Sequence, residues 1–120
     1  MRFKLWMLAF ALIVLSDTAA LACKVPRIKL LDNQTVTGSM FATSGRRCGI
    51  KVRSSRGTLS TAVVSNARNG TVVVSGASIA YTSRAGFVGD DEFTYARRGF
   101  NNLNQPVVRT VVVSVKVAPK

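Results

Sequence analysis

The side chains that could carry chemistry are few. The sequence has no histidine, which is the commonest general base, and beyond its first 22 residues the carboxylates are Asp32, Asp90, Asp91 and Glu92. A glycosidase needs two carboxyl groups that face each other across a cleft, whereas three of these four are contiguous. The sequence also lacks a glycine-rich phosphate loop and a G-x-S-x-G nucleophile motif. We therefore expect no enzymatic activity, no catalytic residues and no cofactor.

The acidic run Asp90, Asp91 and Glu92 is a weak candidate for a calcium site, because calcium binds carboxylate and carbonyl oxygens. A solvated acidic turn accounts for the same three residues, and we favour that interpretation. A zinc site is not expected, since the sequence has neither a histidine nor a C-x-x-C motif. No metal is therefore predicted.

The two cysteines, Cys23 and Cys48, are expected to form a disulfide, because an exported chain meets oxidising conditions and an even count favours pairing. Closing a loop of about 25 residues would stabilise the fold by roughly 3 kcal/mol in the chain-entropy model. Lipidation of Cys23 is a less favoured alternative. A lipobox prefers leucine three residues before the cysteine, where this sequence has Ala20.

Residues 1–22 are predicted to be a secretory signal peptide. Arg2 and Lys4 precede an apolar run from residue 5 to 15, and Ala20-Leu21-Ala22 provides an A-x-A cleavage site. The apolar run is about half the length needed to span a bilayer. Residues 23–120 then form one domain, exported to the periplasm or the extracellular space.

Positive charge is the remaining chemical signal. The sequence has 17 Lys and Arg against 5 Asp and Glu, and beyond the leader 15 and 4 remain. Such a charge attracts anionic polymers without a specific pocket, although basic residues that merely solubilise the domain are an equal alternative. The expected contact surface consists of four cations close in sequence, namely Arg47, Lys51, Arg53 and Arg56.

Short alternating segments must position these residues. In residues 48–53, Cys48, Ile50 and Val52 share one face. The cations Arg47, Lys51 and Arg53 face the other way, which predicts a strand with a buried face and a charged face. The valines of residues 107–117 also recur at spacing two. Together with the segments in between, about seven short strands and no amphipathic helix are expected, which is typical of an Ig-like antiparallel β-sandwich.

The N-terminal part and the turns give weaker signals. Residues 24–31 are expected to be an extended segment or an edge strand, because Pro26 is tolerated there. Residues 33–43 give little strand signal. Asn69-Gly70 is typical of a type I′ hairpin turn, and Ser75-Gly76 predicts a second turn.

Residues 79–95 are expected to hold the structural corner of the fold. Two glycines bracket Phe87, which predicts a tight turn around a buried ring. Asp91 precedes Tyr95 by four residues, the pattern of a tyrosine corner, in which the phenol hydroxyl binds nearby backbone. The alternative is that these are ordinary turn residues and core aromatics. The predicted corner residues are Phe87, Asp91, Phe93 and Tyr95.

Several short motifs occur here in order: Gly70-Thr71-Val72, Tyr81-Thr82, Gly86-Phe87, Gly89, Asp91, Phe93-Thr94-Tyr95 and the valine-rich 111–117. This order resembles the C-terminal half of bacterial cadherin-like and Ig-like repeats, over about half of the chain beyond the leader. The resemblance implies an Ig-like sandwich that acts as a spacer, adhesin or binding domain. Arg97-Arg98-Gly99 stands where many family members carry an acidic residue, so the resemblance does not extend to calcium binding.

Three function classes follow. The first is a secreted or periplasmic Ig-like binding or adhesion module without catalytic activity. The second is an electrostatic binder of anionic envelope polymers such as polysaccharide, lipid headgroups at a membrane surface, or nucleic acid. The third is an accessory subunit of a larger secreted assembly, docked through an exposed strand edge. No small-molecule substrate is expected.

Overall fold

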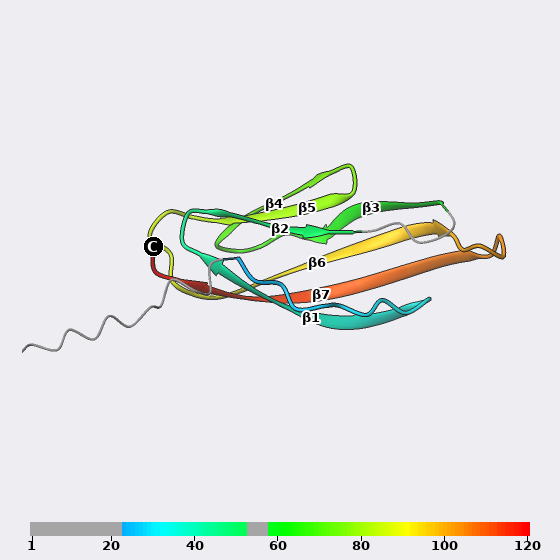
Figure 1. Cartoon of the computed structure of the whole chain (residues 1–120), viewed down its shortest axis with the longest axis horizontal. Helices are drawn as coiled ribbons and strands as arrows, with labels where there is room; N and C mark the ends of the chain where they lie inside the picture. Colours follow the sequence, from blue (N-terminus) through cyan, green and yellow to red (C-terminus); the bar gives the residue numbers. More distant parts are fainter. Residues whose placement is uncertain (1–22, 53–57) are drawn as a thin grey trace, which may run out of the picture.

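The computed structural model describes residues 23–52 and 58–120, which form seven β-strands in two packed sheets (Figure 1). The larger sheet has the strand order β1-β7-β6-β3 and the smaller sheet the order β2-β5-β4. The prediction of an all-β sandwich of about seven strands is confirmed. The predicted leader and the cations Arg53 and Arg56 lie outside the described residues. The strands are β1 (Gln34–Thr43), β2 (Arg47–Lys51), β3 (Thr58–Ser65), β4 (Gly70–Ser75), β5 (Ser78–Ser83), β6 (Gly89–Phe100) and β7 (Pro106–Ala118).

The core lies between the two sheets and follows the predicted alternation. The odd-numbered valines of β7, such as Val111 and Val113, are fully buried. They meet aromatic rings from both sheets, and the rings of Tyr81 on β5 and Phe93 on β6 stack with centroids 5.9 Å apart. Stacked aromatics supply more stabilisation than their buried area alone. The core therefore joins the sheets along most of the length of β6 and β7.

One strand pairing differs from the antiparallel expectation. Residues 34–43, which had little strand signal, form the ten-residue edge strand β1, and β1 pairs in parallel with β7. The sequence signal was weak because the buried face of β1 alternates small residues with larger ones. Gly38 lies on this face, and a Cβ there would collide with Ile28. The glycine thus makes room for the N-terminal segment to pack across β1.

The N-terminal segment itself is extended and forms little regular pairing. Lys24 exchanges two backbone hydrogen bonds of 2.8 Å with Phe41, which is a single antiparallel bridge to the outer edge of β1. Further along, Ile28 and Leu30 pack against the core from its side. Of the two expectations for residues 24–31, an extended segment is therefore the better description.

The predicted hairpin at Asn69-Gly70 is wrong. The strands on either side of this turn belong to different sheets, since β3 pairs with β6 whereas β4 pairs with β5. Gly70 is needed there for a different reason, because a Cβ would meet the backbone of Thr82 and Ser83. The turn at Gly76, which has φ of +57°, does connect a hairpin, between β4 and β5.

Candidate functional site: the edge of β2 and its groove

The acidic residues at the start of β6 build a structural corner. The Asp91 side chain faces inward and accepts four hydrogen bonds of 2.9–3.0 Å, from the backbone N–H groups of Arg68, Asn69 and Glu92 and from the hydroxyl of Tyr81. Asp91 is 8% exposed. The carboxylate thus fixes the crossover between the two sheets, and its hydrogen bonds to N–H donors compensate for its burial.

The tyrosine of this corner is not the predicted one. The hydroxyl that binds Asp91 belongs to Tyr81 on β5, whereas the hydrogen bonds found among the described residues include none from Tyr95. Spacing along one strand could not reveal this contact, since Tyr81 lies across the sandwich from Asp91. Burial, together with the hydrogen bond and the charge of Asp91, raises the pKa of the Tyr81 phenol well above its usual range.

The other two acids do not join Asp91. Asp90 and Glu92 point out of the sheet, and Asp90 lies 3.5 Å from the ammonium of Lys116 in an exposed pair. Within residues 23–52 and 58–120, no three acidic or cysteine side chains are grouped as metal ligands. The alternation of β6 separates Asp91 from Asp90 and Glu92, because neighbouring side chains point to opposite faces.

Phe87 lies beside this corner and is half-buried, less than predicted. Its ring is covered by the guanidinium of Arg84, whose carbon lies 5.8 Å from the ring centroid. Arg84 also donates a 2.9 Å hydrogen bond to the side chain of Asn69. The aromatic ring and the cation together close this end of the sandwich.

The predicted disulfide is present. Cys23 and Cys48 are bonded, with their Cα atoms 5.1 Å apart and a sequence separation of 25. Cys48 lies on the buried face of β2, next to Ile50. The bridge therefore ties the start of the N-terminal segment to the smaller sheet, whereas Lys24 pairs the same segment with the larger sheet.

β2 is an edge strand, and no strand among the described residues pairs with its outer backbone. Val52 donates a 2.7 Å hydrogen bond to Ala77, so even-numbered residues of β2 bond toward β5. Because antiparallel pairs alternate, the N–H and C=O groups of Gly49 and Lys51 point to the free side. The side chains of Arg47 and Lys51 are exposed on the outer face, as predicted from the alternation.

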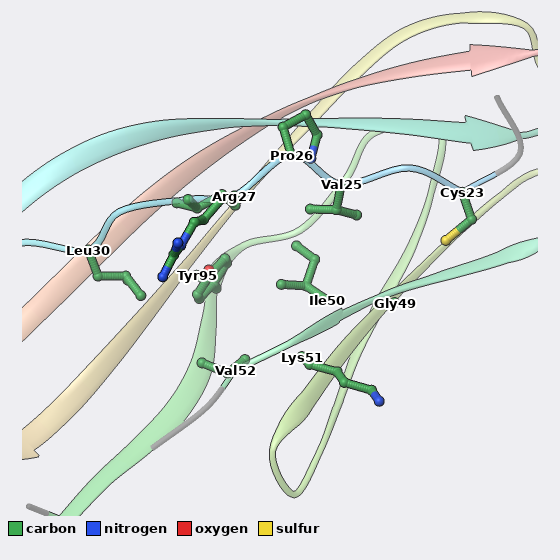
Figure 2. A pocket seen from close by; sticks show the side chains of 11 residues that line it. Cys23, Val25, Pro26, Arg27, Leu30, Gly49, Ile50, Lys51, Val52 and Tyr95 are labelled. Carbon is green, nitrogen blue, oxygen red and sulfur yellow. The ribbon is translucent and has the colours of Figure 1, made fainter. Parts of the chain in front are cut away.

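A groove of about 750 Å³ separates the free edge of β2 from the N-terminal segment. Figure 2 shows Val25 on one wall pointing toward Ile50 on the other, and Val52 pointing toward Tyr95. Arg27 and Tyr95 both line the groove, whereas Lys51 points away from it (Figure 2). The groove is lined by Cys23, Val25, Pro26, Arg27, Ile28, Leu30, Gly49, Ile50, Lys51, Val52 and Tyr95.

Tyr95 lies at the floor of this groove and is 1% exposed. Burial raises the pKa of its phenol, although the charge of Arg97 lowers it in part. The hydroxyl therefore stays protonated at neutral pH and can donate a hydrogen bond. A groove with aliphatic walls and free backbone groups along one side suits an extended chain segment better than a compact substrate.

The far end of the larger sheet holds two arginines that the sequence analysis did not single out. Arg97 on β6 and Arg109 on β7 are directly opposite each other on the inner face. Arg109 binds the carboxylate of Asp32 at 2.6 Å, and Arg97 donates a 3.2 Å hydrogen bond to Thr61. Burial, and then the charge of Arg109, lowers the pKa of Arg97. The signal was available, because Arg97 has the parity of the buried Phe93 and Tyr95.

Comparison with known proteins gives no relative. No protein-family model matches the sequence, and no curated protein matches it. Nor do residues 23–52 and 58–120 contain a helix that is long and apolar enough to cross a bilayer.

Proposed function

We propose that the protein is an exported Ig-like binding module without catalytic activity, and that it engages an anionic partner along the edge of β2. The strand order supports the Ig-like assignment, because seven-stranded Ig sandwiches also divide into a three-stranded and a four-stranded sheet with crossovers between them. The disulfide supports export, since such bonds persist in oxidising compartments.

One observation carries the choice of surface. The free edge of β2 combines unpaired backbone groups, an apolar groove and two exposed cations, Arg47 and Lys51. Backbone groups at such an edge bind an added strand or an extended polymer, whereas the cations select for negative charge. Neither cation has an acidic neighbour among the described salt bridges.

An accessory subunit of a secreted assembly is the second candidate. The same unpaired edge favours it, because a partner strand could be added there by backbone hydrogen bonds. The two candidates differ in their response to salt. Attraction through exposed cations weakens steeply as ionic strength rises, whereas a paired strand with a buried apolar face depends much less on it.

The test is charge reversal on the outer face of β2. The double variant Arg47→Glu and Lys51→Glu should elute from an anionic column at clearly lower salt than the parent protein and keep its unfolding midpoint. Arg68→Glu with Lys120→Glu is the matched control, because both residues are exposed, lie outside β2 and give the same change in net charge. Equal shifts for the two variants would mean that net charge alone binds the polymer, and the β2 surface would then be abandoned.

A further inference from the structure

We propose that the loop joining β6 and β7 is a membrane-docking tip that inserts Phe100 and Leu103 into an anionic lipid surface. This surface is separate from the β2 edge and goes beyond the function proposed there. The inference starts from four of the seven large apolar side chains that are exposed among the described residues: Leu103 by 71%, Phe100 by 48%, Leu31 by 39% and Val108 by 36%. We call these four residues the tip patch.

The four residues of the tip patch come together at one end of the molecule. The β6–β7 hairpin reaches farthest from the C-terminus, at the opposite end of the sandwich (Figure 1). Phe100 is paired with Pro106, and Val108 lies two residues further along β7 on the same face. Asn33 exchanges hydrogen bonds with Val108, and Leu31 lies two residues before it in the chain, so Leu31 also lies toward this end. Clustered apolar side chains of this size mark an interaction site more often than scattered ones.

Four of the five backbone N–H groups of the tip loop, residues 101–105, are bound within the loop. The Asn101 side chain accepts hydrogen bonds from the N–H groups of Leu103 and Gln105, at 2.9 and 3.0 Å. Asn101 N–H donates to the carbonyl of Gln105, and Asn104 N–H donates to the carbonyl of Asn101. Unpaired backbone groups are costly in hydrocarbon, so a loop that binds its own N–H groups enters an interface at little cost.

The charges around the tip patch fit an anionic lipid headgroup layer. Arg98 is exposed and lies opposite Val108, and Lys29 is exposed two residues before Leu31. The acid nearest to this end is Asp32, which is already bound to Arg109. The other acids lie at the start of β6, about 30 Å away at the usual rise per residue. Cations that flank inserted apolar side chains are attracted to anionic leaflets.

The protruding shape of the tip patch suits a lipid surface better than it suits a protein. Leu103 and Phe100 project from the end of a hairpin, so a protein partner would need a matching pocket. A bilayer deforms around such a tip and also accommodates the asparagines of the loop in its headgroup layer.

The test uses a single tryptophan as a depth reporter. Residues 23–120 contain no tryptophan, so Leu103→Trp in a Trp6→Phe background places the only indole at the tip. The protein is isolated after expression with its own leader, and its first residue is determined by mass spectrometry. The probe is a vesicle of equal parts phosphatidylglycerol and phosphatidylcholine, compared with pure phosphatidylcholine. We expect the emission to shift to shorter wavelength on the anionic vesicle.

Val73→Trp in the same background is the matched control, because Val73 is 59% exposed on β4, outside the tip patch. Its emission should not shift. Vesicle binding without a shift at position 103, or an equal shift at position 73, would overturn the proposal. A shift at position 103 that appears without vesicles and grows with protein concentration would overturn it in favour of a protein interface.

A second variant tests the energetics without a reporter. The double variant Phe100→Ser with Leu103→Ser should weaken binding to the anionic vesicle at least about tenfold. Burial of one large apolar side chain raises the affinity by about that factor. Leu103 is largely exposed and Phe100 about half exposed, so the unfolding midpoint should change little. Reversal of Arg47 and Lys51 should leave the emission shift at position 103 intact, which separates this surface from the β2 edge. Undiminished vesicle binding by the folded serine variant would refute insertion.

Discussion

The two ends of β6 differ in what surrounds their buried charged groups and in what they leave exposed. At its start, Asp91 is buried and has four hydrogen-bond donors around one carboxylate. Near its end, Arg97 is buried opposite a second arginine, and the adjoining hairpin exposes Phe100 and Leu103. The same strand therefore has one end organised around internal contacts and another end with apolar groups left at the surface.

This difference separates structural residues from candidate functional ones. A buried charge with a full set of donors stabilises the fold and has little capacity left for a ligand. Exposed apolar side chains and unpaired edge backbone contribute little to folding and retain their capacity for a partner. Mutations at the two ends should accordingly affect different measurements: stability at the start of β6, and binding at the hairpin tip and the β2 edge.

The largest effect is expected at the acid corner. Asp91→Ala leaves the N–H groups of Arg68 and Asn69 and the Tyr81 hydroxyl without their acceptor, which should cost at least about 3 kcal/mol of unfolding free energy. Urea denaturation measures this cost. Asp90→Ala is the control, since its side chain is exposed, and we expect a change within about 0.5 kcal/mol. Equal losses at both positions would contradict the comparison of the two ends.

A smaller effect is expected for Tyr81→Phe, about 1.5–3 kcal/mol near neutral pH, because a hydrogen bond to a charged group is lost. The pKa of this phenol is raised in the folded protein, so stability is full below the unfolded pKa of about 10 and falls as pH rises beyond it. The variant should lose stability less steeply in that alkaline range. Urea midpoints on either side of the tyrosine pKa test this, and an unchanged slope would show that Tyr81 is not responsible.

The smallest effect is expected for Tyr95→Phe. A tyrosine corner at this position would predict a loss of about 1 kcal/mol, whereas a hydroxyl that only faces the groove predicts a change within about 0.5 kcal/mol. The same denaturation experiment decides between them. A loss of unfolding free energy comparable with that of Tyr81→Phe would support the predicted tyrosine corner at Tyr95. It would also show that the hydroxyl at the groove floor has a structural role.

Much of the fold could be predicted from alternation alone. The faces of β2 and β7 follow directly from residue parity, and a sequence with two cysteines allows only one intramolecular bridge. The misassigned features depend on contacts between sheets. Asn69-Gly70 has the composition of a hairpin turn, but the partner of each flanking strand lies elsewhere in the chain. In the same way, no local spacing could relate Tyr81 to Asp91.

The candidate site was predicted in part. Arg47 and Lys51 were placed on the outer face correctly because Cys48 and Ile50 are buried beside them. The groove was not foreseen, since it is formed by an N-terminal segment whose sequence shows little periodicity. The tip patch was visible as Phe100 and Leu103 in a polar loop, but the contribution of Leu31 depends on the parallel pairing of β1 with β7.

The disulfide also has a consequence for strand exchange between molecules. β1 is an edge strand, and edge strands are readily exchanged between two copies of a protein by domain swapping. Here Cys23 precedes β1 and Cys48 follows it, so β1 is part of the covalent loop that the disulfide closes. To donate β1, a molecule would have to insert a closed ring into its neighbour rather than one loose end. The disulfide thus opposes exchange of β1 between molecules, and we expect strand-swapped dimers only after the disulfide is reduced.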